Sequence, residues 1–323
     1  MYIVTGAAGF IGSAIVSRLN AEGIKEILLV DEIGTSEKWR NLTKLHFYEY
    51  MHKSAFIGEL LAGNISDDIQ AIIHMGACSS TSENDFDYLN ETNTAYTSSL
   101  AGYAIEHGIR FIYASSAATY GDGSEGYSDD HKLISKLKPL NRYGYSKQLF
   151  DYKASELGFL SEICGLKFFN VYGPNEYHKA DMRSVVHKAF LQVNESGSIK
   201  LFKSYRKEYK HGQQKRDFVY VKDCQDVIWW LLKNRKVNGI FNLGSGTART
   251  WNDLAQAVFK SMGKKPKIEY IEMPEDLRNQ YQYLTEAPMQ KIKKAGYKKT
   301  FTKLEDGVAD YVKGYLMKED AYL

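Results

Sequence analysis

Strand-like runs alternate with amphipathic stretches along the first part of the chain. Mostly apolar runs of strand type lie at residues 2–4, 27–30, 69–74, 110–114 and 166–169, and such runs are typical of strands buried on both faces of a parallel sheet. Between them, residues 13–19 and 87–106 indicate helices. This alternation predicts an α/β fold with a Rossmann-type, doubly wound parallel sheet.

From about residue 172 the order of elements becomes looser. Residues 217–221 and 240–244 predict strands, the second of which returns to the main sheet. Residues 268–273 alternate as a half-exposed strand does, residues 303–318 form an amphipathic helix, and Asp223 and Thr250 are expected to cap helices. We expect a nucleotide-binding domain over residues 1–171, with returning segments near residues 217–245, and a smaller α/β substrate domain made mainly of residues 172–323.

Composition excludes several classes of protein. The 323 residues are 44% apolar and 25% charged, with a net charge of +3, which gives no argument for nucleic acid or an anionic membrane as a partner. No apolar run approaches the ~20 residues that span a bilayer, and the first motif begins too early for a signal peptide. Three cysteines without metal-site spacing indicate reduced thiols, no metal and a cytoplasmic protein.

The strand at residues 2–4 leads into a glycine-rich turn, Gly6-x-x-Gly9-x-x-Gly12, and then into a helix. Glycines let the backbone turn tightly and approach a pyrophosphate, which binds free N–H groups at the helix start. The spacing differs from the G-x-G-x-x-G fingerprint, and glycine turns also close ordinary strand–helix joints. The dinucleotide interpretation therefore depends on the residues that follow.

Asp31 ends the second strand, nineteen residues after Gly12. A dinucleotide fold places an acidic residue there, on the 2′-hydroxyl of the adenosine ribose. The carboxylate favours NAD because it repels a 2′-phosphate, whereas Lys38 and Lys53 can neutralise that phosphate. The residues leave NAD and NADP both open. His74, in a later strand, is interpreted as a packed residue, and the small residues after it suit a cofactor crevice.

Candidate catalytic groups lie in a Tyr-x-x-x-Lys pattern at Tyr143 and Lys147. Residues four apart share a helix face, and a nearby ammonium favours the phenolate, so the pattern predicts a tyrosine base with a lowered pKa. Ser116, at the end of a strand, is expected to hydrogen-bond the same substrate oxygen. The pattern also occurs by chance on helices, but its place after the glycine turn and Asp31 strengthens the prediction.

Taken in this order, the motifs resemble the extended short-chain dehydrogenase/reductase superfamily and its NAD-dependent epimerase/dehydratase family. The runs at residues 76–81 (Gly-Ala-Cys-Ser-Ser-Thr), 113–121, 168–174 and 215–221 are similar to the ADP-heptose epimerases of that family over nearly the whole chain. The resemblance implies bound NADP and inversion of C6″ of ADP-D-glycero-D-manno-heptose, through transient oxidation to a ketone, in the synthesis of lipopolysaccharide core precursors. It also implies a homo-oligomer, a pentamer.

The resemblance implies roles for individual residues. Ser116, Tyr143 and Lys147 carry the hydride-transfer chemistry, and Lys179 is a second acid/base group for the opposite face of the carbon. Cofactor contacts are implied for Gly6, Gly9, Phe10, Ile11, Gly12, Asp31, Glu32, Lys38, Lys53, Met75, Gly76, Ala77, Cys78, Ser79, Asn93, Tyr143, Lys147, Val171 and Lys179. Substrate contacts are implied for Ser116, Asn170, Asp181, Lys188, Phe202, Lys203, Ser204, Tyr205, Arg216 and Tyr281.

Alternative functions stay open at this point. A 4,6-dehydratase of the same fold needs an acid pair after its catalytic serine, where this chain has Ala117 and Ala118. A 4-epimerase needs no second base, so Lys179 distinguishes the two epimerases unless it serves as a phosphate or ribose contact. A non-catalytic NAD(P)-binding protein usually lacks the tyrosine or the lysine. The basic, aromatic residues 203–216 are interpreted as a loop over an anionic small molecule, or else as a solvated surface loop.

Overall fold

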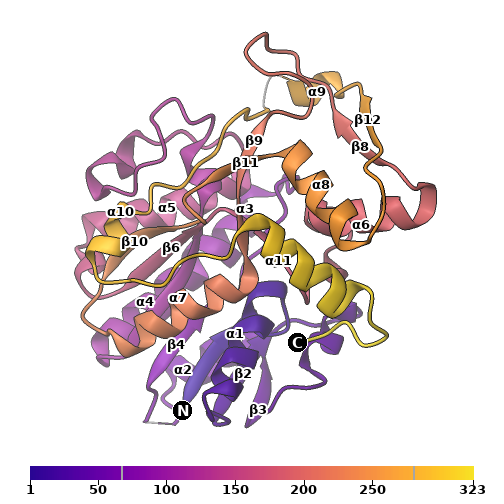
Figure 1. Ribbon diagram of the computed structural model, residues 1–323. Coiled ribbons are helices and arrows are strands. Elements are labelled where there is room, and N and C mark those ends of the chain that lie inside the picture. The colour runs from indigo at the N-terminus through magenta and orange to yellow at the C-terminus, as the bar shows by residue number, and fades with distance from the viewer. Residues whose placement is uncertain (67, 279–280) are drawn as a thin grey trace.

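The computed structural model describes residues 1–66, 68–278 and 281–323. Its centre is a seven-stranded sheet in the order β10-β6-β5-β4-β1-β2-β3, with every neighbouring pair parallel (Figure 1). The strands are β1 (Tyr2–Thr5), β2 (Ile27–Asp31), β3 (Glu49–His52), β4 (Ala71–His74), β5 (Arg110–Ser116), β6 (Cys164–Phe168) and β10 (Gly239–Leu243). The strand order reverses between β1 and β4, at the switch point where open α/β sheets bind ligands. The predicted Rossmann-type sheet is confirmed.

Helices cover both faces of this sheet. Successive side chains of a strand point to opposite faces, and here both faces carry apolar side chains that the helices bury. Val4 and Leu29 pack into the core beneath α1 and α7, whereas Ile3 and Leu28 pack into the core beneath α2, α4 and α5. The helices of these two layers are α1 (Phe10–Ala21), α2 (Lys53–Leu61), α3 (Phe86–Leu89), α4 (Tyr96–Glu106), α5 (Arg142–Glu156), α7 (Val221–Lys233) and α10 (Gln290–Lys294).

The later elements form a smaller α/β layer beside the sheet (Figure 1, upper right). Its strands are β7 (Asn170–Tyr172), β8 (Ile199–Phe202), β9 (Lys215–Tyr220), β11 (Ala248–Thr250) and β12 (Ile268–Ile271), and its helices are α6 (Val185–Ser196), α8 (Trp251–Ser261), α9 (Glu275–Arg278) and α11 (Leu304–Tyr311). Within the segment expected to return to the main sheet, α7 and β10 do so. β9 instead pairs with β7 and β11 in a three-stranded sheet.

The two predicted helix caps have different outcomes. Thr250 caps α8 with a capping box, in which its hydroxyl accepts a hydrogen bond from the Asp253 N–H at 3.0 Å. Asp223 is not a cap, because α7 already begins at Val221. The Asp223 carboxylate instead accepts two hydrogen bonds of 2.9 Å from Thr302, so it anchors a distant segment to α7.

Several elements escaped prediction, among them α6, β8 and β11, and two others belong to the edge of the main sheet. Strand β3 reads Glu-Tyr-Met-His and is exposed at both ends, so it lacks the apolar run of a central strand. Helix α2 follows it directly and buries only Phe56 and Leu60. The predicted helix over residues 87–106 is present as α3 and α4, joined by a π-helical segment, Asn90–Ala95.

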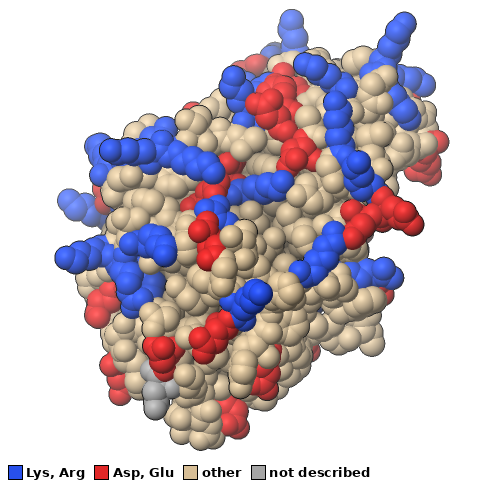
Figure 2. Space-filling model, turned by 60° about the horizontal axis from the view of Figure 1, so that its bottom comes forward, with Lys and Arg blue, Asp and Glu red and all other residues tan. Residues whose placement is uncertain are grey.

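Charged side chains of both signs are interspersed on the face shown in Figure 2. Among the described residues, no helix combines the length and the apolar character that a membrane span requires. The three cysteines are unpaired, and Cys164 and Cys224 are buried.

Leu166 tests the main core. It lies in β6, is fully buried and packs with residues of α1 and α7, so Leu166→Ala should lower the free energy of unfolding by about 2–5 kcal/mol. Chemical denaturation measures the change. The control is Leu191→Ala on α6, where the side chain is 43% exposed, and it should change stability by less than about 0.5 kcal/mol. Equal effects would contradict the assigned core.

Candidate active site

The turn between β1 and α1 brings backbone against backbone. Gly6 has a φ of +64°, and a Cβ atom there would lie 2.7 Å from the backbone of Gly76. A Cβ atom on Gly12 would lie 2.0 Å from the Gly6 carbonyl oxygen. Helix α1 follows Gly9 without a side-chain cap or an acidic residue in its first turn, which leaves its first N–H groups available to a phosphate. These features fit the pyrophosphate of a dinucleotide.

Asp31 ends β2 with both carboxylate oxygens engaged. Oδ2 accepts a hydrogen bond from the Ala8 N–H at 2.8 Å, and Oδ1 accepts from the Lys38 ammonium and the Glu32 N–H, each at 2.7 Å. Lys53 pairs with the Glu32 carboxylate at 2.5 Å. The acid expected to meet the ribose is therefore already paired with a lysine, and a second ammonium lies beside it.

Asn93 fixes the segment after β4 through hydrogen bonds to the backbone of Cys78. Asn93 is fully buried; its Oδ1 accepts from the Cys78 N–H at 2.8 Å, and its Nδ2 donates to the Cys78 carbonyl at 2.9 Å and to Ser146 Oγ at 3.0 Å. Its amide therefore positions the cofactor crevice and does not line it, contrary to the role implied by the resemblance.

His74 is a packed residue, as interpreted from the sequence. Its ring nitrogens lie 2.6 Å from Thr5 Oγ1 and 2.8 Å from Thr97 Oγ1. Burial lowers its pKa to about 3, so the imidazole is neutral at physiological pH.

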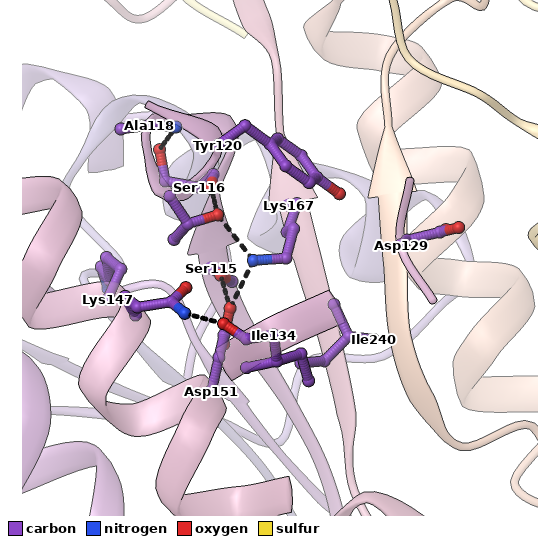
Figure 3. Close-up of polar contacts among 12 residues, drawn as sticks. Ser115, Ser116, Ala118, Tyr120, Asp129, Ile134, Lys147, Asp151, Lys167 and Ile240 are labelled. Atoms are coloured by element: carbon purple, nitrogen blue, oxygen red, sulfur yellow. Dashed lines mark hydrogen bonds and ion pairs between the residues drawn. The ribbon is translucent and has the colours of Figure 1, made fainter. Parts of the chain in front are cut away.

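Ser116, Tyr143 and Lys147 enter one cavity from β5 and α5. Asn141 caps α5 through a 2.8 Å hydrogen bond from the Gly144 N–H, and this start places Tyr143 and Lys147 one turn apart. The Ser116 hydroxyl accepts from the Ala118 N–H at 3.1 Å, as Figure 3 shows. Lys147 is 4% exposed, and burial lowers its pKa to about 8.

The pKa of Tyr143 differs from the prediction. Burial raises it above the ordinary value of a phenol, and only a side-chain hydrogen bond with Ser116 lowers it. The expected lowering by Lys147 is wrong for this structure, because the ammonium donates to the Ala114 carbonyl at 2.9 Å. Ser116 is therefore the group that favours the phenolate.

Lys179 enters the cavity from the short turn Tyr177–Met182. Its ammonium lies 5.6 Å from the centre of the Phe10 ring. Burial lowers its pKa, and Glu176 opposes that change. The next residue, Ala180, has a φ of +45°, a strained conformation that costs about 1–3 kcal/mol. Surrounding contacts must therefore hold the turn in place.

Two asparagines supply such contacts and tie the Lys179 turn to the glycine turn. Asn41 Nδ2 donates to the Ala8 carbonyl at 2.8 Å and to the Asn175 carbonyl at 3.1 Å. Asn175 Nδ2 donates to Ser13 Oγ, on α1, at 2.9 Å. The position of Lys179 therefore depends on the same backbone that fits the cofactor.

These groups line a cavity of about 1200 Å³, which exceeds the ~300–1000 Å³ of most small-molecule pockets and suits two ligands together. Its lining contains the predicted substrate residue Asn170 and most of the predicted cofactor and catalytic residues: Gly6, Gly9, Phe10, Ile11, Gly12, Asp31, Glu32, Lys38, Lys53, Met75, Gly76, Ala77, Cys78, Ser79, Ser116, Tyr143, Lys147, Val171 and Lys179.

Arg216, on β9, is a buried cation beside this cavity. Its guanidinium carbon lies 5.7 Å from the centre of the Trp251 ring and 5.0 Å from that of Tyr281. Trp251 itself lines the cavity. Burial lowers the pKa of Arg216, and among the described residues no carboxylate pairs with it. A desolvated cation without a counter-charge suits an anionic ligand.

The remaining predicted substrate residues lie outside the lining of the main cavity. Tyr281 lines a neighbouring hollow of about 270 Å³, which shares Leu140 and Gln282 with the main cavity. Lys203 and Tyr205 both contact the exposed Glu272. The residues concerned are Asp181, Lys188, Phe202, Lys203, Ser204, Tyr205, Arg216 and Tyr281.

Sequence reasoning missed several lining residues. His178 lies 3.3 Å from Asn41 through its Nδ1, and burial lowers its pKa to about 4. Its place next to Lys179 was a usable signal. Trp251 and Gln282 also line the cavity, but they come from distant segments without a motif, so only the folded chain reveals them.

Residues 2–244 match the model of the NAD dependent epimerase/dehydratase family. The chain belongs to this family. A protein of Nitratidesulfovibrio vulgaris (strain DP4), named ADP-L-glycero-D-manno-heptose-6-epimerase, is 56% identical over 323 residues, which cover all of both chains. A Fusobacterium nucleatum protein of the same name is 48% identical over 332 aligned positions and also covers both chains fully.

The fold is similar to that of a solved relative. The crystal structure of Helicobacter pylori ADP-L-glycero-D-manno-heptose-6-epimerase has a TM-score of 0.76 at 26% identity, and the match covers 96% of this chain and 94% of that chain. Similarity therefore extends over both the sheet and the smaller layer.

The buried ammonium of Lys147 should destabilise the fold near neutral pH. Its pKa falls from 10.5 to about 8, so below pH ~8 the folded chain bears the full cost of a desolvated charge, and the cost is relieved as pH rises toward 10.5. Lys147→Met should therefore raise the free energy of unfolding near pH 7 by up to about 3 kcal/mol, and by less near pH 9.5.

Chemical denaturation of the cofactor-free protein at both pH values measures this effect. Lys153→Met is the matched control, because Lys153 is exposed on the same helix. A difference between Lys147→Met and wild type that does not vary with pH would contradict a buried charge at Lys147.

Proposed function

We propose that this protein inverts C6″ of ADP-D-glycero-D-manno-heptose to give ADP-L-glycero-D-manno-heptose, in the synthesis of lipopolysaccharide core precursors. The observation that carries the proposal is one cavity that receives Ser116, Tyr143 and Lys147 on one side and Lys179 from a separate turn, above the glycine turn. Relatives that bear the name of this activity, at 56% and 48% identity over full length, support it.

The reaction needs a nicotinamide cofactor, because a carbinol carbon has no acidic proton and direct deprotonation faces a very high barrier. A bound nicotinamide would supply reversible hydride transfer: removal of a hydride from C6″ would give a planar ketone, and its return to the opposite face would invert the carbon with no net redox change. The glycine turn, the segment after β4 and Lys147 line the cavity and would hold the cofactor, and the uncapped start of α1 suits its pyrophosphate.

Tyr143 and Lys179 are the two acid/base groups of the reaction. One of them takes or returns the proton of the C6″ hydroxyl in one configuration of the carbon, and the other does so in the opposite configuration. Ser116 hydrogen-bonds the substrate oxygen and lowers the pKa of Tyr143 against the effect of burial. Burial lowers the pKa of Lys179, which increases the fraction of neutral amine available as a base near neutral pH. Rotation of the ketone between the two hydride transfers moves its oxygen from one of these groups to the other.

Arg216 is proposed to bind the diphosphate of the sugar nucleotide. A guanidinium makes paired, charged hydrogen bonds to phosphate oxygens, and the buried state of Arg216, which has no carboxylate partner in the described part of the chain, favours such a ligand. Trp251 and Tyr281 fix its plane. The elements after residue 172 thus form the substrate domain, with Asn170 at its border.

NADP is proposed as the cofactor of this NAD(P)-dependent enzyme. The Asp31 carboxylate, which would repel a 2′-phosphate, is paired with Lys38 at 2.7 Å. Lys53 lines the same end of the cavity, so two ammonium groups are available to the phosphate oxygens.

We propose that the protein forms a homo-oligomer, a pentamer. We also propose that it is located in the cytoplasm. Three large apolar side chains, Trp39, Phe47 and Tyr48, are exposed just before the edge strand β3, and contact between subunits would cover such surface. The unpaired cysteines suit a reducing compartment.

Removal of either proposed acid/base group should stop epimerisation. Tyr143→Phe and Lys179→Met should each lower kcat by about 10²–10⁴-fold, because each removes proton transfer on one face of the carbon. NMR of the sugar after incubation with ADP-D-glycero-D-manno-heptose measures inversion at C6″. Tyr145→Phe is the control, since Tyr145 is 47% exposed on the same helix and should keep full activity.

The same assay separates the alternatives. Inversion of C4 in a UDP-sugar, without reaction of ADP-heptose, would favour a 4-epimerase. Full turnover by Lys179→Met would show that a second base is not needed. A wild-type protein that retains NADP but converts neither substrate would favour a binding protein.

Lys38 should set the cofactor preference. Lys38→Met removes a charged hydrogen bond to the 2′-phosphate and frees Asp31 for a ribose hydroxyl, so NADP affinity should fall by about tenfold or more while NAD affinity holds or rises. Calorimetric titration of cofactor-free protein with each dinucleotide measures both. Lys25→Met, at an exposed position, is the control, and an equal loss for NAD and NADP would contradict this role of Lys38.

A further inference from the structure

A buried ion pair lies behind the catalytic groups, between Lys167 of β6 and Asp151 of α5 (Figure 3). The Lys167 Nζ lies 2.6 Å from Asp151 Oδ2, and the two side chains are 1% and 0% exposed. Neither residue lines the cavity, so neither touches a bound ligand.

Every polar atom of this pair has a partner. Lys167 also donates to Thr119 Oγ1 at 2.6 Å, and its ammonium lies 5.1 Å from the centre of the Tyr120 ring. The Asp151 carboxylate also accepts hydrogen bonds from the hydroxyls of Ser115, at 2.7 Å, and Tyr113, at 2.9 Å. The network is therefore closed and holds one geometry.

The pair joins the two elements that carry the chemistry. Asp151 lies one helical turn beyond Lys147 and two beyond Tyr143 on α5, so the three share a face. Thr119 donates its hydroxyl hydrogen to the Ser116 carbonyl at 2.8 Å. The Lys167 ammonium thus connects α5, which carries the Tyr143 phenol, with the turn Ala117–Tyr120, which follows the Ser116 hydroxyl.

Stability alone does not account for such a pair. Buried ion pairs are often replaceable by apolar residues of similar volume at little or no cost in stability. Here a single cation, Lys167, contacts both Asp151 of α5 and Thr119 of the turn Ala117–Tyr120.

We propose that Lys167 is a positioning residue of the epimerase, which holds Ser116 and Tyr143 in register through Thr119 and Asp151. This inference rests on the proposed function of the same site. Catalytic geometry tolerates little error, because displacement by about 1 Å can cost a hundredfold in rate. Substrate binding by Arg216 and the smaller domain does not pass through this network.

Displacement of Ser116 relative to Tyr143 should raise the pKa of the Tyr143 phenol. Burial raises the pKa of Tyr143, and the Ser116 side chain lowers it, so a displaced Ser116 leaves burial unopposed and the pKa rises further. The other group that acts on the phenol is Cys78, after β4, whereas Lys147, on the same helix, and Lys179, from beyond β7, line the same cavity. None of these changes when the link at Thr119 is cut.

Three variants of the full-length protein test the proposal. Thr119→Val keeps the ion pair and cuts the link to Ser116, Lys167→Met removes the cation, and Asp151→Asn combined with Lys167→Met removes both charges. Each should lower kcat by about tenfold or more with KM unchanged, and each should raise the pKa of Tyr143. The control is Lys222→Met, which opens an exposed ion pair with Asp310 and should change neither.

Two readouts keep the outcomes separate. The Tyr143 titration is followed by NMR of protein labelled with [ζ-13C]tyrosine, with the signal assigned by its loss in Tyr143→Phe, and it needs no substrate. Thermal unfolding reports folding: Lys167→Met should be destabilised by its uncompensated carboxylate, whereas the double variant should recover stability but not kcat or the Tyr143 titration.

Folded Thr119→Val and double variants with wild-type kcat and an unchanged Tyr143 titration would overturn the proposal. A recovery of kcat in parallel with stability in the double variant would also overturn it. If wild-type protein converts no ADP-heptose, the proposed function fails, yet the tyrosine titration still supports or overturns the role of Lys167.

Discussion

Contact between backbones at the switch point of the sheet is the constraint on which the rest of the molecule depends. Gly6 and Gly12 leave no room for a side chain, because Gly76 and the Gly6 carbonyl already occupy that space. The first turn of α1, which has no side-chain cap, starts beside the paired ends of β1 and β4. Two other parts of the site are tied to that point: the Asp31 carboxylate accepts a hydrogen bond from the Ala8 N–H, and Asn41, which contacts the Lys179 turn, donates to the Ala8 carbonyl.

Desolvated cations give the site its electrostatic character. Burial lowers the pKa values of Lys147, Lys179 and Arg216, and no ion pair within the described chain compensates any of these three, whereas Lys167 has Asp151. Two ligands that each carry a diphosphate would complete the charge balance. The modest net charge of +3 therefore says little about the local field, which is set by the few groups that fold inside.

Local patterns predicted the parts of the molecule that local forces determine. The glycine turn, Asp31 at the end of β2 and the pair Tyr143 and Lys147 on one helix each follow from short-range spacing. The sequence failed where tertiary contacts decide. Asn93 turned its amide to Cys78 rather than to the cavity, and the edge strand β3 lacked an apolar run.

Electrostatic predictions failed for a related reason. The proximity of an ammonium to a phenol can be inferred from a helical spacing, but the direction in which the ammonium donates cannot. Lys147 donates to the Ala114 carbonyl, and burial then dominates the pKa of Tyr143. Lys167 did leave a trace in the sequence as a charge within an otherwise apolar strand, although only the fold shows which carboxylate meets it.

The 3₁₀ helix Glu37–Leu42 carries both Lys38, which pairs with Asp31, and Asn41, which anchors the Lys179 turn. The two residues are three apart, on a single turn of chain. Engineering that reshapes this turn to exchange one nicotinamide dinucleotide for another would also displace the tether of the turn that carries Lys179. The surroundings of Asp31 and the position of Lys179 are thus mechanically linked in this scaffold, and a successful redesign has to rebuild the Asn41–Asn175 contact together with the Lys38–Asp31 pair.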